Sequence, residues 1–423
     1  MDLVTAELER IHSAAATNDS GEVSGYLPQL AAANPQHFGL AVASMAGNVY
    51  VAGNARVPFS IQSISKPFVF ALVLNAVGLD EVLEYVRAEP SGDAFNSINL
   101  ERGTGRPSNP MVNAGALVTC SLVPGDRDEK WRQIQDALST FAGRPLELDE
   151  ETFAAERAIG DRNRALAYLM RSLGSLNANA DDIAEVYFRQ CSLTVNCVDL
   201  AIMAATLGNG GVNPCTGIRV VSNETAEQVL TVMATCGMYD YAGEWMLQVG
   251  LPAKSGISGG LAAASPSQLG FGAYSPPLDR HGTPVRAIAA ANQLSDRFEL
   301  HLMHDLGLSA PTVFHTTEIG NTSLRRLQGE IEFAAAETVL AALDDLDEGN
   351  THLILDLSHV TRLQRLAAQM IDARLNALRD NGTSVTVADP TERGLLQAVD
   401  RQVTSLHEEL RDLRVQAKPR SPR

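Results

Sequence analysis

The spacing of apolar and polar residues predicts two groups of strands separated by a long helical region. Residues 38–54 contain two apolar runs joined by a turn at 45–48, which is the signal of a β-hairpin. Residues 59–78 begin polar and become apolar on nearly every face, which predicts a buried helix. Pro67 fits the first turn of that helix because proline has no N–H to donate, so the helix should start close to Ser63.

Helical periodicity dominates the middle of the chain. It predicts a first helix at 4–17 and further helices at 128–142, 162–173, 181–187, 198–207 and 222–234. Two short apolar strands with glycine-rich turns follow in residues 252–279, and then a helix near 285–304. Strands at both ends with helices between them indicate one mixed sheet that carries an inserted helical subdomain.

The pattern changes at residues 315–320, which we interpret as a seam between domains. Beyond it, strands and helices alternate regularly, as in a small α/β domain, at 323–332, 334–343, 352–357, 366–380, 384–388 and 391–399. We therefore predict a first domain at 1–316, a second at 317–412 and a disordered basic tail at 413–423.

Composition narrows the classes of function. The 423 residues exceed one ordinary core and indicate a multidomain chain. A net charge of −17 disfavours nucleic acid and anionic membranes as partners, because both would be repelled. The sequence has no apolar run long enough to cross a membrane and lacks the basic start of a secretory signal. These features predict a cytoplasmic protein.

The cysteine and histidine content predicts neither disulfides nor a metal site. Five cysteines are an odd number, and none forms a C-x-x-C pair, so buried reduced thiols are expected. No His/Cys cluster has the spacing of metal ligands.

Lysine is rare in this chain. Only four of the 33 basic residues are lysines, namely Lys66, Lys130, Lys254 and Lys418. Arginine stays charged near neutral pH, whereas a desolvated lysine can act as a base. Each lysine is therefore a mild candidate for proton transfer.

Two of these lysines lie in motifs that can carry chemistry. In Ser63-Ile64-Ser65-Lys66 the hydroxyl and the amine are three residues apart, so they share a helix face. A serine needs a neighbouring base to become a nucleophile. The alternative is a capping serine beside a surface lysine, which the apolar run 67–77 counts against.

The second motif is Lys254-Ser255-Gly256, which resembles the K-[ST]-G strand of penicillin-recognising enzymes. Taken alone, it is equally a glycine-rich turn. Downstream of S-x-x-K, with strands in suitable places, the pair indicates a serine β-lactamase-like fold.

Six segments in order resemble the glutaminase family over roughly residues 20–310. They are FSIQSISKPF, NPMVNAGA, ERAIGDRNRALAYLM, VYFRQCS, CGMYDYAGEW and VGLPAKSGISGG. The resemblance implies that Ser63 attacks the side-chain amide of L-glutamine while Lys66 takes its proton. Ammonia leaves a γ-glutamyl-Ser63 intermediate, which water hydrolyses to glutamate. The backbone N–H groups of Ser63 and Ile257 would hold the oxyanion; most relatives have valine at the Ile257 position, but the contact is through the main chain.

The same resemblance assigns further substrate contacts to Asn113, Glu156, Asn163, Tyr187 and Tyr239. Glu156 would pair with the substrate ammonium, and the two asparagines would bind the amino-acid head. Tyr239 would pass a proton to the leaving ammonia, and Tyr187 would orient the Ser63 hydroxyl. Without the family pattern, a core tyrosine, a solvated glutamate and a capping asparagine explain these residues as well. Gln62 and Ser65 are expected to support the nucleophile.

Residues of about 320–412 resemble a STAS domain through LQGEIEF and LILDLSHVTRL. Switching members of that family carry a phosphorylatable serine in an Asp-Ser-Ser-Gly run after the central strand. The equivalent stretch here is Gln364-Arg365-Leu366-Ala367, so that switch should be absent. We expect a protein partner or an assembly role for this domain, with a passive appended domain as the alternative.

Together these features predict a serine β-lactamase-like α/β catalytic domain with a helical subdomain, followed by a STAS domain. The resemblance implies glutaminase activity without a cofactor and a homodimer or homotetramer. Two alternatives remain open: a β-lactamase or transpeptidase, which the missing signal peptide disfavours, and a cytosolic amino-acid sensor with output through the STAS domain.

Overall fold

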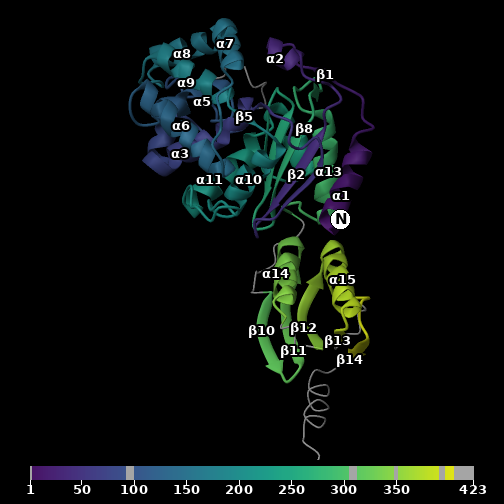
Figure 1. Cartoon of the computed structure of the whole chain (residues 1–423). Helices are drawn as coiled ribbons and strands as arrows, with labels where there is room; N and C mark the ends of the chain where they lie inside the picture. Colours follow the sequence, from purple (N-terminus) through teal and green to yellow (C-terminus); the bar gives the residue numbers. More distant parts are fainter. Residues whose placement is uncertain (1, 92–99, 304–311, 347–350, 390–395, 404–423) are drawn as a thin grey trace, which may run out of the picture. The chain divides into compact units, whose positions relative to one another are not determined.

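The chain folds into two compact units, Met1–His304 and Asp305–Arg423 (Figure 1). The structure is a computed structural model that describes residues 2–91, 100–303, 312–346, 351–389 and 396–403. Strand β10 (Val313–Ile319) belongs to the second unit, so the segment 315–320 that the pattern assigned to a seam is largely a strand. The predicted tail at 413–423 lies outside the described residues.

Among the described strands of the first unit, β1 (Glu22–Val23) pairs with β9 (Pro277–Leu278) and β4 (Phe59–Ser60) pairs with β5 (Thr194–Val195), each as a separate two-stranded sheet. The other five form one sheet in the order β3-β2-β8-β7-β6. Their bounds are β2 Gly39–Ser44, β3 Val49–Gly53, β6 Ala253–Ser255, β7 Gly260–Ser265 and β8 Leu269–Tyr274. The hairpin predicted in 38–54 is confirmed as β2–β3. The pattern predicted a mixed sheet here, yet every pairing is antiparallel. Short turns join β2 to β3, β6 to β7 and β7 to β8, and such turns allow only antiparallel neighbours.

Helices cover both faces of this sheet. Helix α10 (Cys197–Gly208) packs on one face against β2, β7 and β8, while α1 (Leu3–Ala15) and α13 (Val285–Phe298) lie on the other (Figure 1). Two glycines of β8 allow the close approach of α10: a Cβ at Gly272 would lie 2.1 Å from the carbonyl oxygen of Cys197. Helix α13 ends at Phe298 rather than near 304, because Glu299 adopts a left-handed conformation.

The helical subdomain contains the helices that the apolar pattern predicted. They are α6 (Arg127–Ala142), α8 (Asp161–Leu173), α9 (Ala180–Cys191), α10 and α11 (Asn223–Cys236). The structure adds α4 (Leu79–Tyr85), α5 (Asn113–Leu122), α7 (Glu150–Ile159) and α12 (Ala242–Gln248). Helix α5 escaped the pattern because it is only ten residues long and contains Gly115, Val118 and Thr119, residues of low helix propensity.

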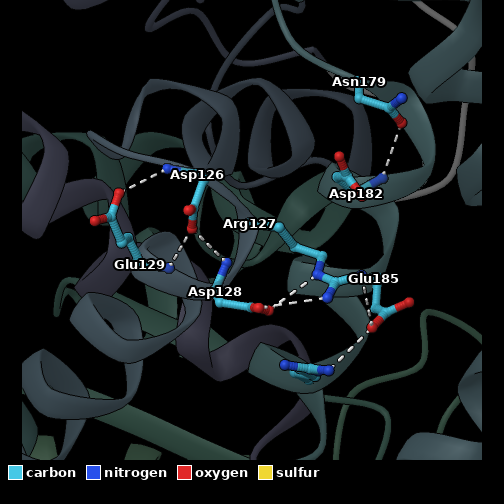
Figure 2. A network of polar contacts seen from close by, with 8 residues as sticks. Asp126, Arg127, Asp128, Glu129, Asn179, Asp182 and Glu185 are labelled. Carbon is cyan, nitrogen blue, oxygen red and sulfur yellow. Dashed lines mark hydrogen bonds and ion pairs between the residues drawn. The ribbon is translucent and has the colours of Figure 1, made fainter.

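Polar caps and ion pairs fix the starts of α6 and α9 (Figure 2). Asp126 and Glu129 form a capping box at α6, and Asn179 accepts two backbone N–H bonds at the start of α9. Arg127 pairs with Asp128 at 3.0 Å and reaches Glu185 of α9 at 3.9 Å (Figure 2). Of these contacts, the two caps define where α6 and α9 begin, and α9 is the helix that carries Tyr187.

The second unit has a mixed sheet in the order β10-β11-β12-β13-β14, in which only the β10–β11 pair is antiparallel. The other elements are β11 Thr322–Ile331, α14 Phe333–Asp344, β12 His352–Leu363, α15 Arg365–Asp380, β13 Ser384–Ala388 and β14 Arg401–Val403. Strand β12 is longer than the predicted 352–357. Of the helix predicted at 391–399, residues 391–395 lie outside the described part, and 396–399 are not helical.

None of the described helices is long and apolar enough to cross a bilayer.

Candidate active site

Ser63 lies in a short 3₁₀ turn, η1 (Gln62–Ser65), that leads directly into helix α3 (Lys66–Val77). The α-helix therefore begins at Lys66, three residues later than Ser63, with Pro67 in its first turn. In a 3₁₀ turn residues three apart still share one side, so the predicted common face is kept. Gln62 has a left-handed backbone with φ 51°, an energetically costly conformation directly before Ser63.

Lys66 is buried, with 1% of its surface exposed. Its Nζ lies 2.7 Å from Oδ1 of Asn113 and 3.3 Å from the hydroxyl of Tyr239. Burial lowers the pKa of Lys66 to about 7, against the opposing influence of the Cys191 and Cys120 thiols. The surface-lysine alternative is thereby excluded, and a large fraction of this amine is neutral near pH 7.

Tyr239 connects the hydroxyl of Ser63 with the amine of Lys66. It opens the 3₁₀ turn η2 (Tyr239–Tyr241) and also has a left-handed backbone, with φ 57°. Burial raises the pKa of Tyr239, and a side-chain hydrogen bond with Ser63 acts in the opposite direction. Ser63 itself is partly exposed. The sequence predicted a direct approach of Ser63 to Lys66; the described contacts join them through the phenol.

Asn113 is the centre of a second set of contacts. Its Oδ1 accepts from Lys66 and, at 3.3 Å, from the hydroxyl of Tyr187, while its Nδ2 donates to Oδ1 of Asn163 at 3.1 Å. The helices α5, α8 and α9 thus bring three of the predicted residues together. The Tyr187 hydroxyl contacts Asn113, so its described link to Ser63 is indirect.

Glu156 of α7 is 2% exposed, which excludes the reading of a solvated helix residue. Burial raises the pKa of Glu156, and hydrogen bonds from Gln62 and Tyr26 oppose that shift. The Tyr26 hydroxyl donates to Oε2 of Glu156 at 3.2 Å. Sequence reasoning missed Tyr26, because an isolated tyrosine in a polar segment 130 residues from its partner has no local signal.

The turn between β6 and β7 passes close to η1, which carries Ser63. A Cβ at Gly256 would lie 3.1 Å from the side chain of Ile64 and 3.3 Å from the carbonyl oxygen of Ile61, so a glycine is favoured there. Ile257 follows in the same turn and is partly exposed. Its position beside η1 is compatible with a backbone N–H directed at the reacting group.

Lys254 of β6 is a second fully buried lysine. Its Nζ donates to the carbonyl oxygen of Ser255 at 2.7 Å and lies 3.8 Å from the centre of the Tyr239 ring. Burial, and then the charge of Lys66, hold the pKa of Lys254 well below its ordinary range. Both lysine motifs therefore converge on Tyr239.

The described residues contain no group of three or more His, Cys, Asp or Glu side chains arranged to hold a metal ion.

The models of two known protein families match this chain. The model of the Glutaminase family matches residues 21–303, and that of the STAS domain matches 314–399. The chain belongs to the glutaminase family. Among named relatives, a glutaminase of Corynebacterium efficiens is 39% identical over 387 residues, covering 91% of this chain and 92% of that protein.

Glutaminase 2 of Bradyrhizobium diazoefficiens is 42% identical and is matched over 85% of this chain. The chain spans 61% of that protein and 50% of glutaminase 1 from the same organism.

Solved glutaminase structures share the fold. A crystal structure of Mglu superimposes with a TM-score of 0.72 at 39% identity, covering 93% of this chain and 99% of that one. Mglu in its glutamate form gives 0.72 at 36% identity, with coverages of 92% and 99%. A Bacillus glutaminase gives 0.65 at 32% identity over 71% of this chain and all of its own. The predicted fold class, a β-lactamase-like α/β unit with a C-terminal STAS domain, is confirmed.

Proposed function

We propose that this chain hydrolyses L-glutamine to L-glutamate and ammonia through a γ-glutamyl-Ser63 intermediate. The observation that carries the proposal is the continuous path from the partly exposed Ser63 hydroxyl, through Tyr239, to the buried amine of Lys66. Membership of the glutaminase family and the glutamate form of Mglu support the substrate.

In the acylation step Ser63 Oγ attacks the side-chain carbonyl carbon of glutamine. Its proton passes to the Tyr239 oxygen as the phenolic proton passes to neutral Lys66. Backbone N–H groups of Ser63 and Ile257 stabilise the oxyanion. The carbon–nitrogen bond then breaks while the Lys66–Tyr239 pair returns a proton to the leaving ammonia.

Deacylation uses the same groups in reverse. A water molecule gives a proton to the Tyr239–Lys66 pair and attacks the ester carbon of the γ-glutamyl group. The carbon–oxygen bond to Ser63 breaks, glutamate leaves, and the proton returns to Ser63 Oγ.

Substrate recognition falls to the buried polar groups around Ser63. Glu156 pairs with the α-ammonium group in a charge-assisted bond, in a place where its charge is poorly solvated without a partner. Asn113 and Asn163 supply amide donors and acceptors to the amino-acid head, together with Tyr187.

The deciding experiment is a coupled ammonia assay with glutamine, asparagine and a chromogenic cephalosporin. Wild type should release ammonia from glutamine, and Ser63→Ala and Lys66→Ala should each lose at least about 10³-fold in kcat. Lys130→Ala serves as a control, because Lys130 donates to the backbone carbonyls of Ser121 and Val123 at the end of α5 and should leave turnover unchanged.

Other outcomes support the rival functions. Turnover of the cephalosporin alone would indicate a β-lactamase or transpeptidase. Glutamine binding without ammonia release, unchanged in Ser63→Ala, would indicate an amino-acid sensor.

For the whole chain we propose a cytoplasmic homodimer or homotetramer in which the STAS domain binds a protein partner or another subunit. Five free cysteines, four of them buried, support a reducing compartment. Arg365 opens helix α15 after the N-cap residue Gln364, where switching STAS domains carry a serine, so the proposed interaction does not depend on phosphorylation there.

A further inference from the structure

A buried chain of hydrogen bonds links helix α9 to the turn that carries Ser63. The thiol of Cys120 lies 3.0 Å from Oε1 of Gln190, and Nε2 of Gln190 donates to the hydroxyl of Ser65 at 2.9 Å. The Ser65 hydroxyl in turn donates to the carbonyl oxygen of Gln62 at 2.7 Å. The chain runs from α5 through α9 into η1 and ends one residue before the nucleophile.

This series of hydrogen bonds is closed to solvent, and every bond in it is donated in the same direction, from Cys120 toward Gln62. Cys120, Gln190 and Ser65 are 0% exposed, and Gln62 is 3% exposed. The thiol proton goes to the amide oxygen, the amide N–H goes to the hydroxyl oxygen, and the hydroxyl proton goes to the carbonyl. A reversed amide would place its N–H against the thiol and its oxygen against a hydroxyl whose proton is already committed. Each bond therefore fixes the next, and a buried chain of this kind is cooperative.

The end of the chain controls the peptide group that precedes Ser63. The carbonyl of Gln62 and the N–H of Ser63 belong to one planar trans peptide, so a bond that fixes the oxygen also fixes the direction of the N–H. Gln62 holds this peptide in a left-handed conformation that a free chain rarely adopts. A restraint on its carbonyl is what such a conformation requires.

We propose that Gln190 and Ser65 are positioning residues that aim the Ser63 N–H at the oxyanion of the reaction. The inference rests on the proposed function. It gives helix α9 a second role, in addition to carrying Tyr187. Tyr187, three residues before Gln190, contacts Asn113 beside Lys66, so one face of α9 supports both the proton acceptor and the oxyanion donor.

The test uses Ser65→Ala and Gln190→Leu, each of which breaks the chain. If the N–H of Ser63 no longer points at the oxyanion, kcat should fall about 10- to 100-fold. KM should stay within about twofold, because this hydrogen bond forms only in the transition state. Ser192→Ala is the matched control: its hydroxyl is also fully buried and bonded to a carbonyl, that of Phe188 at 2.8 Å, but it is not part of the hydrogen-bond chain from Cys120 to Gln62. It should retain kcat within about twofold.

Two further comparisons separate positioning from general destabilisation. The Ser65→Ala/Gln190→Leu double variant should be no slower than the slower single variant, because both break one chain. Cys120→Ser keeps a donor to Gln190 and should retain more activity than Cys120→Ala. Additive losses in the double variant, losses in KM alone, or a kcat equal to that of Ser192→Ala would overturn the inference.

Amide hydrogen exchange of the peptide that contains residues 61–66 tests the same chain without turnover. It should be faster in Ser65→Ala and Gln190→Leu than in Ser192→Ala, and equal rates would refute the inference. If wild type does not hydrolyse glutamine, the proposed function fails, while the exchange data still decide whether the chain holds the turn. If Ser65→Ala does not fold, the Cys120→Ser and Cys120→Ala pair decides.

Discussion

Single side chains in the catalytic unit owe their chemistry to burial. Lys66 and Lys254 are both nearly inaccessible, and both lie near Tyr239, whose ring centre is 5.5 Å from one Nζ and 3.8 Å from the other. A buried ammonium is poorly solvated, so the neutral amine is favoured in each case. Burial thereby shifts both amines toward the neutral form, and the proposed function uses that of Lys66 as the proton acceptor.

The pH dependence of turnover should follow Lys66. Because its pKa is lowered to about 7 and only the neutral amine accepts a proton, kcat/KM should rise with pH through an apparent pKa near 7 and then level off. A pH–rate profile from pH 5 to 9 measures this limb. A flat profile across that range would contradict the assignment of Lys66 as the base.

Lys66→Met should abolish turnover and stabilise the fold. Since the folded-state pKa of Lys66 lies below the ordinary lysine value of 10.5, the unfolded chain binds more protons between about pH 7 and 10.5, and this opposes folding. The variant should therefore gain about 2–5 kcal/mol in free energy of unfolding at pH 6, with a smaller gain as pH approaches 10. Denaturant unfolding of wild type and Lys66→Met at pH 6 and 9 measures this gain. If the variant is no more stable than wild type at pH 6, burial does not destabilise the charged form of Lys66.

Glu156→Gln should weaken substrate binding more than chemistry. Loss of a charge-assisted bond to the substrate ammonium group should raise KM about 10- to 100-fold and change kcat by less than about fivefold. Steady-state kinetics with glutamine measures both. Glu185→Gln, in a partly exposed ion pair of α9, is the control and should change neither.

At the scale of elements, the packing of the first unit depends on how closely its backbones approach one another. Gly270 and Gly272 of β8 lie against the backbone of α10, and Gly115 of α5 lies against the carbonyl of Asn109. Side chains at these positions would force the elements apart. The surface ion pairs at α6 and α9 contribute little by comparison, because solvent screens them.

Gly272→Ala tests this packing. The new Cβ would lie 2.1 Å from the Cys197 oxygen and 2.7 Å from the Ala201 nitrogen, both backbone atoms, so we expect a loss of more than about 3 kcal/mol in stability. Gly243→Ala in α12 is the matched control: its Cβ meets nothing within 4 Å, and it should stabilise the protein by about 0.5–1 kcal/mol. Thermal or denaturant unfolding of both variants decides; similar stabilities would refute the close approach.

At the scale of the whole molecule, every described contact of the candidate site lies within the first unit. The second unit carries its own core and its own mixed sheet. The residues proposed for catalysis and the domain proposed for protein interaction therefore lie in different units.

Deleting residues 305–423 should leave kcat and KM for glutamine within about twofold and reduce the size of the oligomer. Ammonia release and light scattering after gel filtration measure the two properties. If neither changes, the second unit is a passive appended domain. A more than tenfold loss of turnover in a folded truncated protein would show that catalysis depends on the second unit.

Local signals in the sequence determined much of the fold. The hairpin in 38–54, helices α6, α8, α9, α10 and α11, and the alternation of strands and helices from β11 to β13 follow from periodicities of two and about 3.6 residues. The paired motifs at Ser63 and Lys254 indicated a serine hydrolase. Helices α4, α5, α7 and α12 and the antiparallel direction of the first sheet were not predicted.

Only the tertiary structure decided the electrostatics and connections of the site. The pKa of Lys66 depends on burial by Asn113 and Tyr239, which are 47 and 173 residues away along the chain. Tyr26 meets Glu156, and Gln190 meets Ser65, across similarly long separations. Hydrogen bonds and desolvation act between neighbours in space, whereas periodicity and motifs report on neighbours in sequence, so the residues were largely predictable and their contacts were not.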